Sequence, residues 1–243
     1  MRDADVRIGT SGWHYRHWIG NFYPEDLKAP KMLDWYGRFF DSVELNNTFY
    51  RLPTAKALAA WRDSTPARFL FAVKGSRYLT HMKKLRDPEA GLERFLPLVE
   101  ILGRKLGPIL FQLPPHWSAD AGRLDAFLQA LPRRHRYAFE LRDPSWHTPA
   151  IEATLARHHA AFCIFDIAGF HSPEPITADF TYLRLHGPGG KYQGRYSPDV
   201  LQARARWVRK WRRGLRAIFV YFDNDQAGYA AENARELKER VER

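Results

Sequence analysis

The sequence contains one cysteine, no long apolar run and fewer acidic than basic residues, and each shortage narrows the class of protein. The single Cys163 excludes a disulfide framework or a zinc site built from several cysteines, and its apolar surroundings, AAFCIF, indicate a core residue rather than a nucleophile. No apolar run is long enough to cross a bilayer. The N-terminal MRDADVRIGTSGW lacks the charged-then-apolar layout of a secretory signal. We therefore expect a cytoplasmic protein that does not enter a membrane.

The shortage of acidic residues leaves a formal net charge of +11. Part of this charge lies in LQARARWVRKWRRGLR (201–216), which contains no acid, and part in PRRHR (132–136). The first stretch has the pattern of a helix, with Trp207 and Trp211 one turn apart on an apolar stripe. It is either a solvated helix on the outside of the protein or a surface that contacts the phosphates of a nucleic acid. Both interpretations stay open.

Strand-like and helix-like segments alternate regularly along the chain. The strand-like segments are 6–9, 42–46, 69–74, 109–113, 137–141, 160–166, 181–186 and 217–222. Each is followed by a helical pattern except 160–166, whose successor is poor. With 243 residues, 45% of them hydrophobic, and no linker, the chain matches one domain of βα repeats. We predict a single domain over 1–243, a (β/α)8 TIM-type barrel of eight parallel strands with a weak or irregular sixth helix.

Alternation within the strands predicts where a site would lie, because successive side chains point to opposite faces. One face is apolar and is assigned to the surrounding helices: Val43, Leu45, Phe71, Val73, Phe111, Leu113, Phe139, Leu141, Leu183, Leu185, Phe219 and Tyr221. The other face ends in polar residues: Glu44, Asn46, Lys74, Gln112, Glu140, Arg142, Arg184, His186 and Asn224. Barrels of this kind carry their sites at the C-terminal ends of the strands. We expect this polar set to surround one opening there.

The loops that follow the strands are rich in glycine, aromatic residues and cations. Glycine lets the backbone approach a ligand closely, and aromatic rings offer flat apolar surface. From these loops we add Trp13, Thr48, His81 and Tyr192 to the expected ligand contacts. Thr48 has the alternative role of turning its loop.

Seven strings along the chain resemble one family. They are GTSGWHYRHWIGNFYP, VELNNTFYRLP, FAVKGSRYLTH, FQLPPHW, FELRDPSW, LRLHG and YFDNDQAGYAAENA. In this order, from about residue 7 to residue 240, the chain resembles the YecE-like proteins, domain-of-unknown-function family 72. The resemblance implies a TIM-type barrel, in agreement with the strand pattern, and implies no particular reaction.

Acid–base chemistry is one hypothesis for the polar end of the barrel. The alternation turns Glu44 and Glu140 inward, with Asp166 as a third carboxylate, and two carboxylates can act as general acid and base. His186 is expected to join them as an acid–base residue. The alternative is that the carboxylates are buried partners of the neighbouring cations.

Binding of an anion is the second hypothesis. The expected cations outnumber the inward acids: Lys74, Arg142, Arg184 and His186, with His81, Lys191 and Arg195 at the rim. Arginine matches phosphate and carboxylate groups, and GPGG (187–190) could add backbone donors. No HxH, HExxH or cysteine pair indicates a metal site, and no cofactor is expected.

These patterns lead to a ranked set of functions. The first is a cofactor-independent hydrolase or lyase acting on a small or terminal anionic ligand that bears phosphate or carboxylate, with a sugar-containing ligand as one option. The alternatives are a nucleic-acid-binding module with an aromatic rim and a noncatalytic metabolite-binding protein. The sequence does not indicate the oligomeric state.

Overall fold

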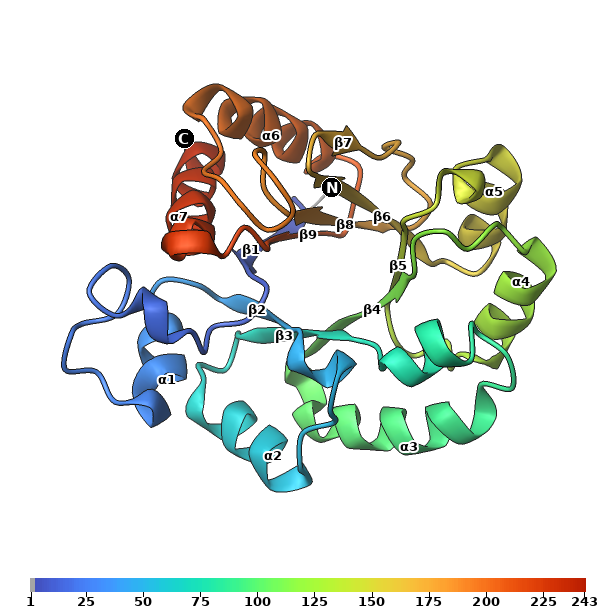
Figure 1. The fold of residues 1–243 in the computed structure, drawn as a ribbon, viewed down its shortest axis with the longest axis horizontal. Helices are drawn as coiled ribbons and strands as arrows, with labels where there is room; N and C mark the ends of the chain where they lie inside the picture. Colours follow the sequence, from blue (N-terminus) through green and yellow to red (C-terminus); the bar gives the residue numbers. More distant parts are fainter. Residues whose placement is uncertain (1–2) are drawn as a thin grey trace.

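The computed structural model describes residues 3–243, and its parallel strands form a ring with helices around it (Figure 1). The strands are β1 Asp5–Thr10, β2 Ser42–Leu45, β3 Leu70–Lys74, β4 Leu106–Leu113, β5 Tyr137–Leu141, β6 Ala161–Ile167, β8 Phe180–Leu185 and β9 Ala217–Phe222. They pair in the order β1-β9-β8-β6-β5-β4-β3-β2. At the remaining seam, a parallel bridge joins Ser11, just after β1, to Glu44 in β2. The predicted eight-stranded TIM-type barrel is confirmed.

Several of the helices outside the barrel begin where the sequence supplies a side-chain cap. The α-helices are α1 Met32–Tyr36, α2 Ala55–Ser64, α3 Glu89–Val99, α4 Ala121–Ala130, α5 Pro149–Arg157, α6 Pro198–Trp211 and α7 Tyr229–Glu242. Thr54, Asp120, Thr148 and Ser197 each accept a hydrogen bond from the backbone N–H three residues further on. Such caps satisfy N–H groups that have no partner within the helix, and so they fix its first residue.

Shorter helical turns lie in the loops. They are η1 Arg16–Trp18, η2 Ala29–Lys31, η3 Asn47–Phe49, η5 Glu100–Lys105, η6 Pro144–Trp146 and η7 Gln226–Gly228, with a π-helical turn, η4 Tyr78–Met82. Several of them follow a strand directly, and they shape the C-terminal rim of the barrel.

The sixth helical position, predicted to be weak or irregular, is irregular in the structure. Within the described chain, residues 168–179 between β6 and β8 contain no helix. A short strand, β7 Phe170–His171, instead turns back and pairs antiparallel with the end of β6. Pro173 and Pro175 lie in this connection, and proline removes the backbone donors that a helix needs.

Two apolar cores lie on either side of the strands. The outer core, between strands and helices, contains Val43, Phe71, Phe111 and Phe139 as predicted. The inner core fills the barrel with Ala72, Leu110, Ala138, Ala161, Cys163, Phe180, Tyr182, Ala217, Phe219 and Tyr221. The assignment of Phe219 and Tyr221 to the outer face is therefore wrong. Alanines opposite these rings leave room for them, so the lower part of the barrel interior is apolar rather than polar.

The basic helix α6 lies on the outside of the barrel (Figure 1). Leu201, Ala205 and Val208 are buried, and Trp207 and Trp211 pack against the outer core with their ring centroids 5.8 Å apart. Part of each indole is therefore engaged in packing against the core. Over residues 3–243, no helix has the length and apolar character needed to cross a membrane.

Candidate functional site

Arg184, on the inner face of β8, is the centre of a buried charge network. Its Nε lies 3.0 Å from Oε2 of Glu44, and its Nη2 donates to Oε1 of Glu44 and to Oδ2 of Asp223, each at 2.8 Å. Its Nη1 donates to Glu140 and to Nε2 of His186, both at 2.7 Å. These contacts supply an acceptor for all five N–H bonds of a fully buried guanidinium. The geometry agrees with the ion-pair alternative for Arg184 rather than with direct contact to a ligand.

Glu44 is held on every side. Besides Arg184, it accepts hydrogen bonds from the Tyr182 hydroxyl at 2.6 Å and the Ser11 hydroxyl at 2.5 Å. Sequence reasoning missed both partners, although Tyr182 stands two residues before Arg184 and so shares its face. A carboxylate with this many fixed donors is suited to neutralising Arg184.

Glu140 and His186 are also held by hydrogen bonds within the protein. Arg142 Nε donates to Glu140 at 2.5 Å, and Arg142 Nη2 lies 3.2 Å from Nε2 of His186. Burial would raise the pKa of Glu140, but Arg142 and Arg184 outweigh it and hold that pKa well below the usual range. Nδ1 of His186 donates to the carbonyl of Asp166 at 2.8 Å, so Nε2 is the acceptor. Burial, followed by Arg184, lowers the pKa of His186 well below its usual value, and the imidazole is neutral.

Asp223 is the inward carboxylate that sequence reasoning missed. It follows Phe219 and Tyr221 on the inner face of β9 and is 6% exposed. Burial raises its pKa to about 6, against the opposing effect of Arg184. The sequence placed Asn224 here, and that placement is wrong because the parity of β9 was inverted. The Asn224 amide instead donates to the Gly194 carbonyl at 2.9 Å and to Asn233 at 3.0 Å.

Asp166 also points away from the barrel interior, contrary to expectation. It shares the parity of Ile164, which belongs to the outer core. Its carboxylate accepts from the Tyr196 hydroxyl and from the His186 backbone N–H, and it lies 3.4 Å from Arg204. Its role is to join β6 to the loop after β8 and to α6.

Lys74 and Gln112 face the opening without being paired. Lys74 is 4% exposed, and its ammonium lies 4.5 Å from the centroid of the Phe49 ring. Within residues 3–243 this ammonium has neither a hydrogen bond nor a carboxylate within ion-pairing distance. Burial, followed by Arg184, lowers its pKa to about 8. On the next strand, Oε1 of Gln112 is buried and has no hydrogen-bond partner in the described chain.

The remaining rim residues divide into structural and accessible groups. The Thr48 hydroxyl lies 2.8 Å from the Leu45 carbonyl and 2.6 Å from that of Lys74, so it turns the loop. His81 contacts Thr80 through Nδ1 at 2.9 Å, and burial, followed by Lys74, lowers its pKa to about 4. The Tyr192 ring lies 5.7 Å from that of His186 and is half-buried at the opening.

The excess of cationic over acidic side chains at the barrel mouth is smaller in the structure than the sequence predicted. Around the centre, Arg184, Arg142 and Lys74 face Glu44, Glu140 and Asp223. His81 and His186 are neutral, and Arg195 pairs with Glu236 on α7 at 2.5 Å.

The backbone donors of the glycine-rich loop 187–190 also have partners within the protein: the N–H of Gly187 donates to Tyr196 and that of Gly189 to Gln193. In residues 3–243, no group of three or more histidine, cysteine or acidic side chains is arranged to hold a metal ion.

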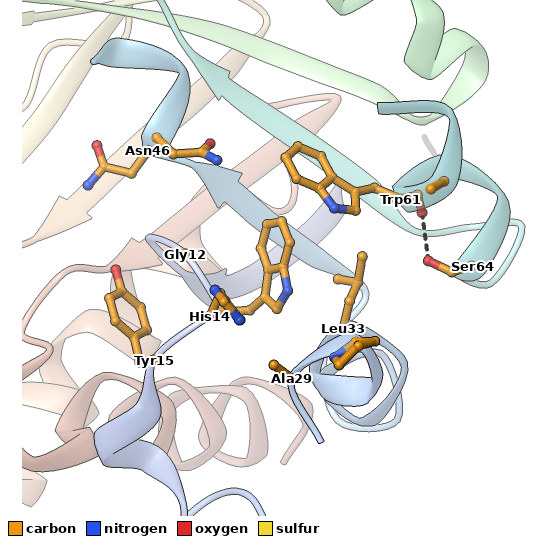
Figure 2. A pocket seen from close by; sticks show the side chains of 12 residues that line it. Gly12, His14, Tyr15, Ala29, Leu33, Asn46, Trp61 and Ser64 are labelled. Carbon is orange, nitrogen blue, oxygen red and sulfur yellow. Dashed lines mark hydrogen bonds between the residues drawn. The ribbon is translucent and has the colours of Figure 1, made fainter. Parts of the chain in front are cut away.

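A cavity of about 670 Å³ lies beside the opening (Figure 2). Its walls come from the loop after β1, the turn η2 with the start of α1, the residues after β2 and the exposed side of α2. Trp13 and Asn46, both expected ligand contacts, line it together with Tyr15 and Trp61. Sequence reasoning identified the aromatic loop but not its partner Trp61, which lies on a helix rather than at a strand end.

Several known proteins are similar to this chain over much of its length. Residues 7–243 match the family model described as "Protein of unknown function DUF72". The UPF0759 protein YunF of Bacillus subtilis is 27% identical over 96% of this chain and 94% of its own length. The UPF0759 protein YecE of Escherichia coli K12 is 28% identical over 58% of this chain and 50% of its own length.

Solved structures agree. A DUF72 family protein from Thermotoga maritima superposes with a TM-score of 0.89 at 29% identity, over 98% of this chain and 100% of the other. A DUF72 family protein from Enterococcus faecalis, at 19% identity, superposes with a TM-score of 0.80 over 98% of this chain and 96% of the other, which shows the shared fold. The chain belongs to the DUF72 family, as the resemblance of its motifs to the YecE-like proteins predicted.

Proposed function

We propose that the barrel mouth binds a small anionic ligand through Lys74 and that Asp223 exchanges protons with it. The observation that carries the proposal is the nearly buried ammonium of Lys74, which has no hydrogen-bond or ion-pair partner in the described chain. A buried charge is stable when it is paired, so an anion that enters the mouth gains a strong contact there. Gln112, with its unsatisfied amide oxygen, supplies a second polar contact for a ligand hydroxyl or for water.

Asp223 is the carboxylate best suited to general acid–base chemistry at this site. Its pKa of about 6 lies near neutral pH, where a group can both take up and release a proton. Glu44 and Glu140 are held by fixed donors and serve to position Arg184. A cofactor-independent hydrolase or lyase acting on a phosphate- or carboxylate-bearing compound fits this division of roles.

Replacing Lys74 with methionine tests the proposal. Calorimetry with inorganic phosphate should show at least about a tenfold loss of affinity, because the charged contact is removed. Lys210→Met removes the same charge from the exposed side of α6 and serves as the matched control, with affinity expected within about twofold of the wild type. Equal losses of affinity in the two variants would show that phosphate binding depends only on the net charge of the protein and not on Lys74.

A further inference from the structure

The cavity beside the mouth has the dimensions of a small-molecule site. Its volume of about 670 Å³ falls within the range that bound organic ligands occupy. Trp13 and Trp61 meet edge to face in its wall, with their centroids 5.1 Å apart and their planes at 86°. Leu33 adds further apolar surface (Figure 2), and Ala60 also lines the cavity. Such walls favour a flat apolar group.

One polar atom in this wall lacks a partner. Oδ1 of Asn46 is buried and accepts no hydrogen bond from the described residues. An unsatisfied buried acceptor is unfavourable, and a ligand N–H or O–H placed there would satisfy it. Because Asn46 lines the cavity, rotation of its amide would present this oxygen to a donor on the group bound there.

The cavity and the mouth share a wall. Asn46 follows Glu44 by two residues on the same face, and the loop it begins is tied to β3 by the contact of Thr48 with the Lys74 carbonyl at 2.6 Å. The next residue in that loop, Phe49, lies against the Lys74 ammonium. On the other side, the Tyr15 hydroxyl donates to the Ser11 carbonyl at 2.6 Å, and Tyr15 also lines the cavity.

We infer that the ligand is an amphiphilic anion, whose apolar ring occupies the cavity at Trp13 and Trp61 while its phosphate or carboxylate lies at Lys74. A hydrogen-bond donor on or beside the ring contacts Oδ1 of Asn46. The inference rests on the proposed function for the anionic end alone. The apolar end depends on the cavity and on the unpartnered amide oxygen.

Phenyl phosphate and inorganic phosphate are the two probes, compared by calorimetry. The wild-type protein should bind phenyl phosphate at least about tenfold more tightly, because the ring buries apolar surface that inorganic phosphate lacks. Ala60→Trp places an indole in the cavity from an exposed position of α2, and it should abolish this preference while leaving the affinity for inorganic phosphate unchanged. Ala55→Trp, at an exposed position of the same helix that does not line the cavity, is the matched control and should keep the preference.

The outcomes separate the two proposals. If inorganic phosphate binds through Lys74 but phenyl phosphate binds no more tightly, the amphiphilic ligand is rejected and the anion site stands. If Ala60→Trp and Ala55→Trp affect the preference equally, the cavity does not hold the ring and the inference is again rejected. If neither probe loses affinity in Lys74→Met, the proposed function fails, and the assignment of the anionic end fails with it.

Discussion

Nη1 of Arg184 donates a hydrogen bond to Nε2 of His186 across 2.7 Å, in a place where neither side chain is exposed to solvent. An imidazole nitrogen that accepts from a guanidinium carries no proton, and the opposite nitrogen of His186 donates to a backbone carbonyl. This pair therefore belongs to a fixed network beneath the mouth. The groups left to meet a ligand are Lys74, Gln112 and Asp223, which lie at the edge of that network.

Arg184→Met should destabilise the fold severely. The variant leaves Glu44, Glu140 and Asp223 close together without their shared cation, and breaking a buried ion pair costs about 3–5 kcal/mol. Denaturant titration measures the loss in the free energy of unfolding. Arg195→Met, which removes an exposed ion pair with Glu236, should change it by less than about 1 kcal/mol. Similar stabilities for the two variants would contradict the structural role of Arg184.

Glu140→Gln distinguishes a structural carboxylate from a proton-transfer group. The amide keeps the shape but removes the charge that faces Arg142 and Arg184, so the melting temperature should fall by several degrees. Glu236→Gln, which weakens an exposed pair, is the control and should leave the melting temperature nearly unchanged. A Glu140→Gln protein with wild-type stability and lost activity would instead identify Glu140 as catalytic.

The alternation along the strands predicted most residues of the barrel mouth, because near the strand ends the polar residues are also the ones that point inward. Glu44, Lys74, Gln112, Glu140 and Arg184 are all buried polar residues on the inner sides of their strands. Polarity alone failed at β9, where the inner residues Phe219 and Tyr221 are aromatic. Because faces alternate, the next inward residue after Phe219 and Tyr221 is Asp223. If these two rings are instead assigned to the outer face, the inward residue becomes Asn224.

A pattern of small residues would have corrected this error. Ala72, Ala138, Ala161 and Ala217 lie on four different strands and all point into the barrel, and alanines on the same face of several strands indicate an interior that must accommodate larger rings from other strands. The alternation cannot predict which side chains form hydrogen bonds or ion pairs with one another. The alternation shows that Arg184 points inward, but only coordinates show that three carboxylates and His186 use all its donors.

Asp223 should make stability depend on pH in a direction opposite to that of an ordinary ion-paired carboxylate. Its folded-state pKa of about 6 exceeds the usual value of 3.8, so between these limits the folded protein binds more protons than the unfolded chain. Ionising Asp223 therefore opposes folding, and its contribution to the free energy of unfolding falls as the pH rises through this window. Asp223→Asn does not titrate there. The stability of the wild type relative to this variant should fall by on the order of 2–3 kcal/mol from about pH 4 to about pH 7. A difference between the two proteins that is independent of pH would contradict the raised pKa.

Lys74 should set an upper pH limit on anion binding. Burial, followed by Arg184, lowers its pKa to about 8, so the ammonium that would contact the anion is lost above that pH. Sulfate is the suitable probe because it stays fully ionised throughout, and above about pH 7 Asp223 is already ionised and adds no further change. Calorimetry should show a nearly constant affinity from about pH 7 to about pH 8 and then a fall of about tenfold for each further pH unit.

Lys74→Arg supplies the matched control for this limit. A guanidinium keeps its charge well above the range in which Lys74 titrates, so the variant should bind sulfate at about pH 7 and show no break near pH 8. Arginine and lysine differ in shape, so the affinity at neutral pH can change, but the position of the break depends on the titrating group alone. The same break in Lys74→Arg as in the wild type would assign the pH dependence to another residue, and it would remove Lys74 from the anion site.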